Sequence, residues 1–322
     1  MVRLGVMIEA QEGLTWQRWQ RIIETAEANN FDSLWRSDHL FSVMGVSERD
    51  QLSLWPSMTL VAARDSKLEF GALVSPTTFR NPVMLAKDSV ALDNLSNGRF
   101  WLGIGAGWNE REHAAFGFPL PPLKQRMDRL EESIEVIKLL WSGEKVSYPG
   151  EQFQLSDAQM RPTSVRSSGI PILIGGSGEK RTLRMVARFA SEWNSNASIH
   201  ETYRHKASVL EQHCRDIGRN SSEIARSVMV GHIIGTTDAE VRQRAARIQE
   251  IMPSMQGLSL DEVMERTHDR GWLVGTPDRV IADIHVLASM GVSRLMLQTH
   301  DQEDMAALEL FATAIMPEAA KL

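Results

Sequence analysis

The sequence predicts a (β/α)8 TIM barrel with insertions, formed as a single domain over residues 1–322. Short apolar segments typical of buried strands alternate with longer amphipathic segments typical of helices along the chain. The length of 322 residues and the hydrophobic content of 43% suit one large barrel. Because no linker rich in Pro, Gly or Ser divides the chain, we expect one domain with insertions rather than two domains.

Each predicted strand is a short, mostly apolar run that is followed by polar residues or glycine. The strands are expected at residues 3–8, 31–35, 68–74, 100–105, 171–174, 192–196, 227–234 and 294–298. The eight strands would be parallel, since each is followed by a helical segment long enough to cross back over the sheet.

The predicted helices carry apolar residues on one face, as Trp19 and Ile22 do in the first of them. Thr15 is the expected N-cap of that helix, and Pro82 stands near the favoured first-turn position of another. The helices are expected at residues 14–29, 54–63, 82–95, 123–141, 199–218, 238–252, 277–290 and 304–315, with a further helix that ends at residue 190. Two segments interrupt the alternation and are interpreted as insertions: a hairpin at 145–155 and an irregular or helical stretch at 253–271.

Composition and charge exclude several classes of protein. The net charge of −6 comes from 35 basic and 41 acidic residues that are well mixed, so nucleic acid is not an expected partner. Cys214 is the single cysteine, which rules out an internal disulfide and a cysteine-rich metal site. The histidines show no metal-binding spacing, so no metal is expected. The sequence shows neither a signal peptide nor the apolar run of about 18 residues that a membrane helix needs, so we expect a cytoplasmic protein with no membrane partner.

A glycine-rich run at residues 98–108 is the most informative part of the chain. Gly103, Gly105 and Gly107 alternate with Ile104 and Ala106, so a buried strand leads directly into a loop with almost no side chains. Glycines in a strand cost backbone entropy and packing, which indicates that something flat or bulky approaches the backbone. We interpret this run as the floor of a cofactor site at the C-terminal end of a barrel strand.

Chemically active residues stand at the ends of three other predicted strands. Glu9 ends the first strand, Asp38 and His39 follow the second, and His300 follows the eighth. A histidine on this face can donate a proton, accept one or bind a substrate oxygen, because its pKa lies near neutrality. Structural roles remain open here: Asp38 as a turn cap, His39 packed against Phe41, and Glu9 in a salt bridge.

A second glycine-rich run, Gly-Gly-Ser-Gly at 175–178, follows the fifth strand and opens a predicted helix. Backbone N–H groups at the start of a helix bind phosphate, and Lys180, Arg181 and Arg184 add positive charge nearby. An ordinary glycine-rich turn is the alternative.

Together these segments resemble the bacterial luciferase-like monooxygenase superfamily over essentially the whole chain. The resemblance rests on Ser-Asp-His at 37–39, Ser-Pro-Thr-Thr-Phe-Arg-Asn-Pro at 75–82, the glycine run with the Glu110, Glu112 and Phe-Gly that follow it, the segment 126–141, Ile-Gly-Gly-Ser-Gly at 174–178, and Gly-Thr-Pro at 275–277 leading to Gly-Val at 291–292. The best match is the branch of coenzyme F420-dependent oxidoreductases, whose members hold a 5-deazaflavin in the barrel mouth. Other branches hold FMN.

This resemblance assigns roles to the strand ends. It implies that Asp38 contacts the cofactor and that His39 faces the substrate. It also implies that a non-proline cis peptide, Ala72–Leu73 by alignment, lies against the central ring, and that the hydroxyl of Ser75 bonds the polar ring.

The resemblance assigns roles to the two glycine runs as well. Ala106, Gly107 and Asn109 would lie along the ring edge. Glu110 and Glu112 follow on the same loop; a place near the site is open to them, but we expect them to be solvated loop charges. The phosphate of the cofactor would be bound by the second run, which consists of Gly175, Gly176, Ser177 and Gly178.

One position departs from the family pattern. In the sugar-oxidising deazaflavin enzymes, the position after the second loop glycine is a catalytic glutamate, and here it is Trp108. This implies that the loop holds the ring without supplying the proton, and it argues against sugar-phosphate oxidation. We place Trp108 in the substrate pocket, together with His300.

The leading interpretation is an F420-dependent oxidoreductase that transfers a hydride between the deazaflavin and a small organic substrate, with His39, Asp38 and Glu9 as candidate catalytic residues. An FMN-dependent monooxygenase that consumes reduced flavin and O2 is the first alternative. A flavin-binding barrel without catalysis is the second. The resemblance further implies a homodimer formed through helices near strands two and three.

Overall fold

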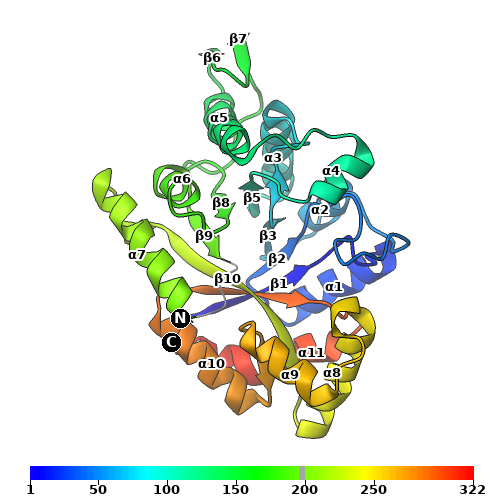
Figure 1. Ribbon diagram of the computed structural model, residues 1–322. Coiled ribbons are helices and arrows are strands. Elements are labelled where there is room, and N and C mark those ends of the chain that lie inside the picture. Colours follow the sequence, from blue (N-terminus) through cyan, green and yellow to red (C-terminus); the bar gives the residue numbers. More distant parts are fainter. Residues whose placement is uncertain (196–199) are drawn as a thin grey trace.

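Eight parallel strands close into a barrel in the computed structural model, which describes residues 1–195 and 200–322 (Figure 1). The barrel strands are β1 (Arg3–Ile8), β2 (Ser33–Arg36), β3 (Glu69–Ala72), β5 (Phe100–Gly105), β8 (Ile172–Gly175), β9 (Glu192–Ser195), β10 (Ala225–Ile234) and β12 (Arg294–Thr299). Strand β12 pairs in parallel with both β1 and β10, which closes the sheet. The predicted (β/α)8 barrel is therefore confirmed.

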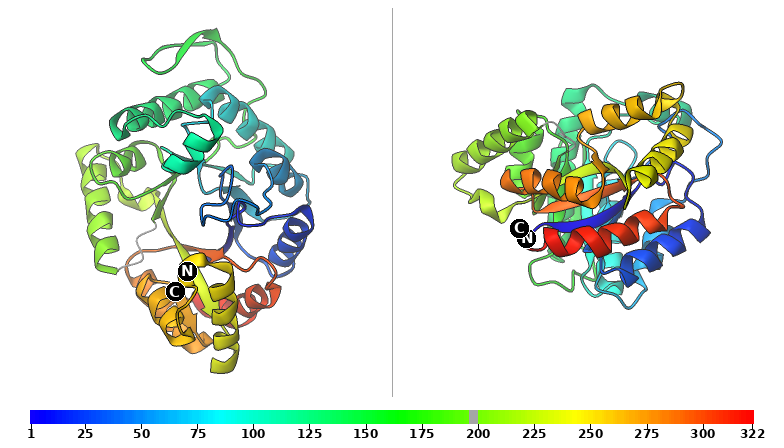
Figure 2. Two further views of the ribbon diagram at one scale, coloured as in Figure 1. Left: turned by 45° about the vertical axis from the view of Figure 1, so that its right-hand side comes forward. Right: turned by 90° about the horizontal axis from the view of Figure 1, so that it is seen from below.

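The helices surround this barrel, as Figure 2 shows. They are α1 (Trp16–Ala28), α2 (Leu54–Ala62), α3 (Pro82–Leu95), α5 (Leu123–Trp141), α6 (Thr182–Phe189), α7 (His200–Asp216), α8 (Asp238–Ile251), α10 (Pro277–Ser289) and α11 (Met305–Leu310), which continues as η3 (Phe311–Ile315) and α12 (Met316–Ala319). Helix α1 starts after Thr15, whose side chain accepts a hydrogen bond from the Arg18 backbone N–H at 3.3 Å, as expected of an N-cap. Within the described residues, no helix combines the length and apolarity needed to cross a bilayer.

Smaller elements decorate the barrel. The predicted hairpin is formed by the antiparallel strands β6 (Val146–Pro149) and β7 (Gln154–Ala158), which extend beyond the body of the barrel (Figure 1). The others are β4 (Ser75–Pro76), α4 (Glu110–Phe116), η1 (Ser221–Glu223), η2 (Pro253–Met255), α9 (Leu260–Asp269) and β11 (Leu273–Gly275). Strand β11 was not predicted, since three residues give no usable alternation; it extends the sheet by pairing with the end of β10.

Two boundaries differ from the sequence prediction at places that shape the site. The third strand was expected to reach residue 74, but β3 ends at Ala72, and the chain pairs again with β5 only through β4. The helix after the fifth strand begins at Thr182, four residues beyond Gly178, because a loop and turn intervene. The predicted strand end at 196 and helix start at 199 lie outside the described residues.

The N-terminal end of the barrel is closed by a buried ion cluster around Arg294. This residue is fully buried, and its guanidinium forms ion pairs with Asp32, Glu69 and Glu192 at 2.7–2.9 Å. Because Arg294, Glu69 and Glu192 are each the first residue of a strand, the cluster joins strands from across the barrel. The guanidinium carbon of Arg294 lies over the Trp101 ring, 5.0 Å from its centroid. Burial raises the pKa of Glu192, so Arg294 is needed to keep that carboxylate charged.

We expect Arg294→Leu to destabilise the protein by about 3–5 kcal/mol, because it leaves buried carboxylates without a counter-ion. Denaturant unfolding followed by circular dichroism measures this loss. Lys124→Ala is the matched control, since Lys124 is 86% exposed in its pair with Asp128 and is expected to change stability by less than about 1 kcal/mol. Equal stability of the Leu variant and the native chain would contradict a structural role for the cluster.

Candidate functional site

A cavity of about 350 Å³ opens at the C-terminal ends of the barrel strands, on the side of β2, β3, β5 and β8. This volume suits a small-molecule site. Its apolar lining includes Leu73, Val74, Pro76, Trp108, Leu123 and Met127. Its polar lining includes Asp38, His39, Glu112, His113, Thr182 and Asn194.

The floor of the cavity is made by Val74, which packs against glycines of two neighbouring strands. A Cβ atom on Gly105 would come within 2.6 Å of a Val74 methyl group, and one on Gly175 within 3.2 Å. A Cβ atom on Gly103 would overlap the carbonyl oxygen of Ala72. The glycine run was interpreted as room for a cofactor. Residues 105–108 of the run do line the cavity, but the space beside Gly103 and Gly105 is taken by the chain itself.

The segment between β3 and β4 contains the predicted non-proline cis peptide, one residue further along than expected. The cis bond joins Leu73 and Val74, and the alignment to Ala72–Leu73 was therefore wrong by one position. Leu73 and Val74 line the cavity. Ser75 lies behind it, fully buried, and its hydroxyl makes no hydrogen bond to the described chain. Its contact with a cofactor ring remains a prediction.

Asp38 lines the cavity and is paired with Arg80. The guanidinium of Arg80 donates to both carboxylate oxygens, at 2.6 and 2.9 Å, in the bidentate geometry that arginine favours. Although burial lowers the pKa of Arg80, its hydrogen bond and charge contact with Asp38 outweigh that effect and raise it. Asp38 therefore presents a neutralised carboxylate that ties the loop after β2 to the segment after β4.

His39 is held in the cavity wall by Glu112. The imidazole Nδ1 lies 3.0 and 3.2 Å from the two carboxylate oxygens, and the Leu40 backbone N–H also donates to this carboxylate. Within the described residues, the Nε2 atom of His39 makes no hydrogen bond. The carboxylate thus fixes the ring with Nδ1 as the donor and leaves Nε2 for a ligand.

Glu112 was expected to be a solvated loop charge, and this was wrong. Its side chain is 1% exposed, because residues 110–116 form helix α4 and turn Glu112 inward. The side chain of Asn109 caps this helix and accepts from the Glu112 backbone N–H at 3.2 Å. The spacing Asn-x-x-Glu before an amphipathic run is the sequence signal that would have revealed the helix. Asn109 was assigned to the cofactor ring, but its side-chain oxygen accepts the capping hydrogen bond. Glu110 is exposed, as expected.

Electrostatics favour the protonated form of His39. Burial by itself would lower its pKa, but the hydrogen bond and charge of Glu112, with the charges of Glu9 and Asp38, outweigh burial and raise the pKa. A raised pKa is the direction expected for a cation that gains carboxylate partners on folding. The His39 contribution to stability is full below the unfolded-state pKa and disappears as pH rises through the folded-state value.

His113 also lines the cavity, although its sequence context looked ordinary. Its Nδ1 lies 2.7 Å from the Asn109 carbonyl oxygen, and its Nε2 lies 2.8 Å from the Thr78 hydroxyl. Because a carbonyl can only accept, Nδ1 is the donor, and in the neutral imidazole Nε2 then accepts from Thr78. A Cβ atom on Gly107 would strike the same Thr78 side chain. Thr78 thereby fixes the loop at 105–109 beside the cavity, where Ala106 and Gly107 line it as expected.

The second glycine run lies at the opposite side of the cavity. Gly175 and Gly176 line it, and the φ of +111° at Gly176 turns the chain away from the strand. Ser177 shares a hydrogen bond with Ser195 at 3.2 Å, and Gly178 abuts Thr182. Phosphate binding by this run remains a prediction.

Two of the three cations expected beside this run pair with other groups. The guanidinium of Arg181 pairs with Asp128 at 2.8 Å and Glu131 at 3.2 Å, and Arg184 pairs with Glu131 at 3.6 Å. These carboxylates belong to α5. A phosphate at the run would therefore rely on backbone N–H groups and the Thr182 hydroxyl, with the exposed Lys180 as the third expected cation.

Glu9 and His300 lie outside this cavity. The Glu9 carboxylate accepts hydrogen bonds from Gln11 and Gln298, so it belongs to a buried polar network. His300 stacks on Trp272 with ring centroids 4.9 Å apart, and both of its ring nitrogens lack partners within the described chain. The structure thus does not bring His300 to the cavity that His39 lines.

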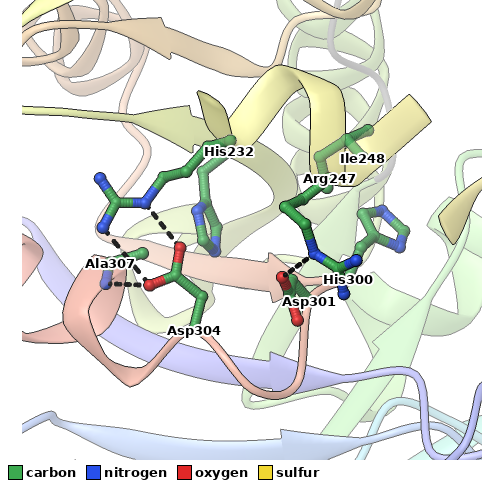
Figure 3. A pocket seen from close by; sticks show the side chains of 8 residues that line it. His232, Arg247, Ile248, His300, Asp301, Asp304 and Ala307 are labelled. Atoms are coloured by element: carbon green, nitrogen blue, oxygen red, sulfur yellow. Dashed lines mark hydrogen bonds and ion pairs between the residues drawn. The ribbon is translucent and has the colours of Figure 1, made fainter. Parts of the chain in front are cut away.

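His300 lines a separate, water-sized cavity with His232, Asp301 and Asp304, shown in Figure 3. Asp304 accepts from Arg244 at 2.6 Å and from the Ala307 backbone N–H at 3.0 Å. Barrel enzymes often bind phosphate in this region, after the seventh and eighth strands. Here the Asp304 carboxylate already accepts from Arg244 and the Ala307 backbone N–H, the donors that a phosphate would need. Burial, then the nearby charge of His300, lowers the pKa of His232 to about 4.

A cavity at the C-terminal face of a TIM barrel, with a carboxylate-anchored histidine in its wall, defines a small-molecule enzyme site. The family model described as "Luciferase-like monooxygenase" matches residues 1–294. The chain belongs to the luciferase-like monooxygenase family, as its sequence resemblance implied.

Two relatives align with nearly the whole chain. The "F420-dependent glucose-6-phosphate dehydrogenase" of Amycolatopsis mediterranei is 28% identical over 323 residues, which cover 91% of each chain. The protein of that name from Mycolicibacterium gilvum is 27% identical over 319 residues, covering 92% of each.

Solved structures share the fold. The coenzyme F420-dependent tetrahydromethanopterin reductase of Methanopyrus kandleri superposes with a TM-score of 0.79 at 20% identity, covering 98% of this chain and 99% of that one. A long-chain alkane monooxygenase superposes with a TM-score of 0.82 at 17% identity, covering 99% and 91%. These similarities confirm the barrel architecture over the full length.

We expect Glu112→Gln to lower the pKa of His39 toward or below its ordinary value of about 6.5, because burial then acts against less opposing charge. Titration of the imidazole by NMR measures the shift. Glu110→Gln is the matched control: Glu110 is on the same helix but exposed, so its loss should leave the titration unchanged. An unchanged pKa in the Glu112 variant would contradict the assigned pair.

Proposed function

We propose that the protein is an F420-dependent oxidoreductase that transfers a hydride between a deazaflavin and an organic substrate. The observation that carries the proposal is His39, whose Nδ1 is anchored by Glu112 and whose Nε2 has no partner in the described chain. Full-length relatives named for F420 dependence support the choice of cofactor.

The cavity fits a flat tricyclic cofactor. Leu73 and Val74 offer an apolar surface for the ring face, and Gly107 and Gly176 line the cavity with backbone alone. The cavity volume of about 350 Å³ suits the ring system of the cofactor and the reacting group of a substrate. Asp38, neutralised by Arg80, places no free negative charge against an anionic ring.

Bound F420 would supply the hydride, or accept it, at its ring carbon. His39 supplies the matching proton through Nε2 when a carbonyl is reduced, and accepts it when an alcohol is oxidised. The Glu112 carboxylate stabilises the imidazolium and keeps the ring oriented. Trp108 packs edge-on against the imidazole, with ring centroids 5.7 Å apart, and shields one side of it from water.

We expect the apo-protein to bind F420 and to bind FMN much more weakly. Parallel titrations of the two cofactors by fluorescence measure both affinities. Tight binding of FMN with no binding of F420 would instead favour the monooxygenase alternative. Failure to bind either cofactor would contradict both enzyme readings.

We expect His39→Ala to retain cofactor affinity and to lower turnover about 100-fold or more, the usual worth of a positioned acid or base. Cofactor titration and steady-state kinetics measure the two effects separately. His205→Ala is the control, because His205 lies on α7 with its side chain 60% exposed. Unchanged turnover of the His39 variant at saturating substrate would remove His39 from the mechanism.

A further inference from the structure

We propose that residues 108–119, the α4 flap, are a movable wall of the cavity, and that the ion pair between His39 and Glu112 is the latch that holds this wall in place. While His39 carries its proton, the flap lies against the barrel. When His39 becomes neutral, the flap is released and the cavity opens. This inference goes beyond the proposed function, because it concerns access to the cavity and holds for any ligand that the cavity accepts.

The first argument is the burial pattern of the flap. The residues of the flap that are buried are all polar, namely Asn109, Glu112 and His113. Its large apolar side chains are 38–63% exposed, namely Trp108, Phe116 and Phe118. A permanently packed element shows the opposite pattern, with its apolar side chains buried and its polar ones in water. The position of the flap therefore depends on specific polar contacts more than on burial of apolar surface.

The second argument is the small number of contacts that hold the flap. Among the described elements, α4 packs extensively against no other helix or strand. Two buried side-chain contacts attach it: Glu112 lies 3.0 Å from the imidazole of His39, and His113 lies 2.8 Å from the Thr78 hydroxyl. The other contacts lie at the surface, where Arg111 donates to the Ser42 carbonyl at 2.6 Å and Phe116 meets Phe41 edge-on. Loss of one buried contact therefore removes a large part of what holds the flap.

The third argument is the backbone at the two ends of the flap. Gly107 precedes it and Gly117 lies after α4, with φ of +74° and +72°. Glycine adopts both signs of φ without steric cost, so these positions can absorb a change in direction of the chain. A Cβ atom on Gly117 would meet nothing within 4 Å, so the chain has space to turn there. Beyond it, Pro119, Pro121 and Pro122 have no N–H with which to tie the connection to α5.

The charge of the latch depends on pH. Burial lowers the pKa of His39, but the hydrogen bond and charge of Glu112, with the charges of Glu9 and Asp38, outweigh burial and raise it. Asp38 is paired with Arg80, whose charge also acts on Glu112. Among the described residues, His39 is the one cation within ion-pair distance of Glu112.

Deprotonation of His39 leaves Glu112 as a carboxylate that is 1% exposed and has no paired cation. A buried charge without its partner is strongly unfavourable, and movement of the flap into water relieves this cost. The sign follows from the raised pKa: the latch is complete below the unfolded-state pKa of His39 and is lost as pH rises through the folded-state value.

Hydrogen exchange of the apo-protein, followed by mass spectrometry from about pH 5 to about pH 9, tests the latch, because this range brackets a histidine pKa raised above about 6.5. Each rate is divided by that of an unstructured peptide at the same pH, which gives a protection factor. We expect protection in residues 110–118 to fall about tenfold or more as His39 loses its proton, the worth of a hydrogen bond to a charged group. Protection in α3 should stay constant, since only the flap opens.

Three variants separate the latch from a general loosening of the flap. Glu112→Gln removes the charge, so protection of the flap should be low at every pH, with no step. Arg111→Gln removes the surface contact with the Ser42 carbonyl, so protection should fall by a constant factor while the step remains. Glu110→Gln is the matched control, because Glu110 is an exposed carboxylate on the same helix, and it should behave as the native chain does.

Constant protection of the flap across the pH range in the native chain, or a step that persists in Glu112→Gln, would overturn the latch. A parallel loss of protection in α3 would overturn the flap as a separate moving element, since the whole barrel would then be opening. Protection in α3 also reports whether each variant is folded. Because every measurement uses the apo-protein, the outcome does not depend on which cofactor the cavity holds.

Discussion

The packing of Val74 against the glycines of β5 and β8 is the constraint on which the site depends. The segment between β3 and β4 turns into the barrel mouth; glycine at 103 and 105 leaves room for Ala72 and Val74, and glycine at 175 avoids a tight contact with Val74. The cavity floor, the adjoining loop at 105–109 and the position of β4 all follow from this contact. A side chain at 103 would overlap backbone, and one at 105 or 175 would press on a Val74 methyl group.

The wall that holds His39 is built from segments far apart in the sequence. Helix α4 supplies Glu112 to His39 and His113 to Thr78, while Arg80 supplies the partner of Asp38. Each polar contact satisfies a group that burial would otherwise leave at a cost. Because all these contacts converge on the mouth of one cavity, the loops after β2, β4 and β5 are fixed relative to one another. That arrangement holds the imidazole of His39 in one orientation and leaves one of its nitrogens for a ligand.

The two ends of the barrel divide structural and chemical roles. At the N-terminal end Arg294 neutralises carboxylates from three regions of the chain, which concerns stability. At the C-terminal end Asp38 is paired with Arg80, and Glu112 raises the pKa of His39. The region where barrels often bind phosphate is closed by the Asp304 carboxylate. A cavity with no cation in its described lining and an exposed Trp108 differs from what the phosphorylated substrate named for the curated relatives would require.

The sequence alone determined the barrel, the family and the bounds of elements such as β1, β5, α3 and α5, which match the prediction residue for residue. Those features depend on periodicity and capping within one segment, which a single sequence displays. The early end of β3, the burial of Glu112 and the separation of His300 from His39 depend on contacts between distant segments. Only the tertiary structure decided these, because the space beside a strand, and the partner of a buried charge, come from other parts of the chain.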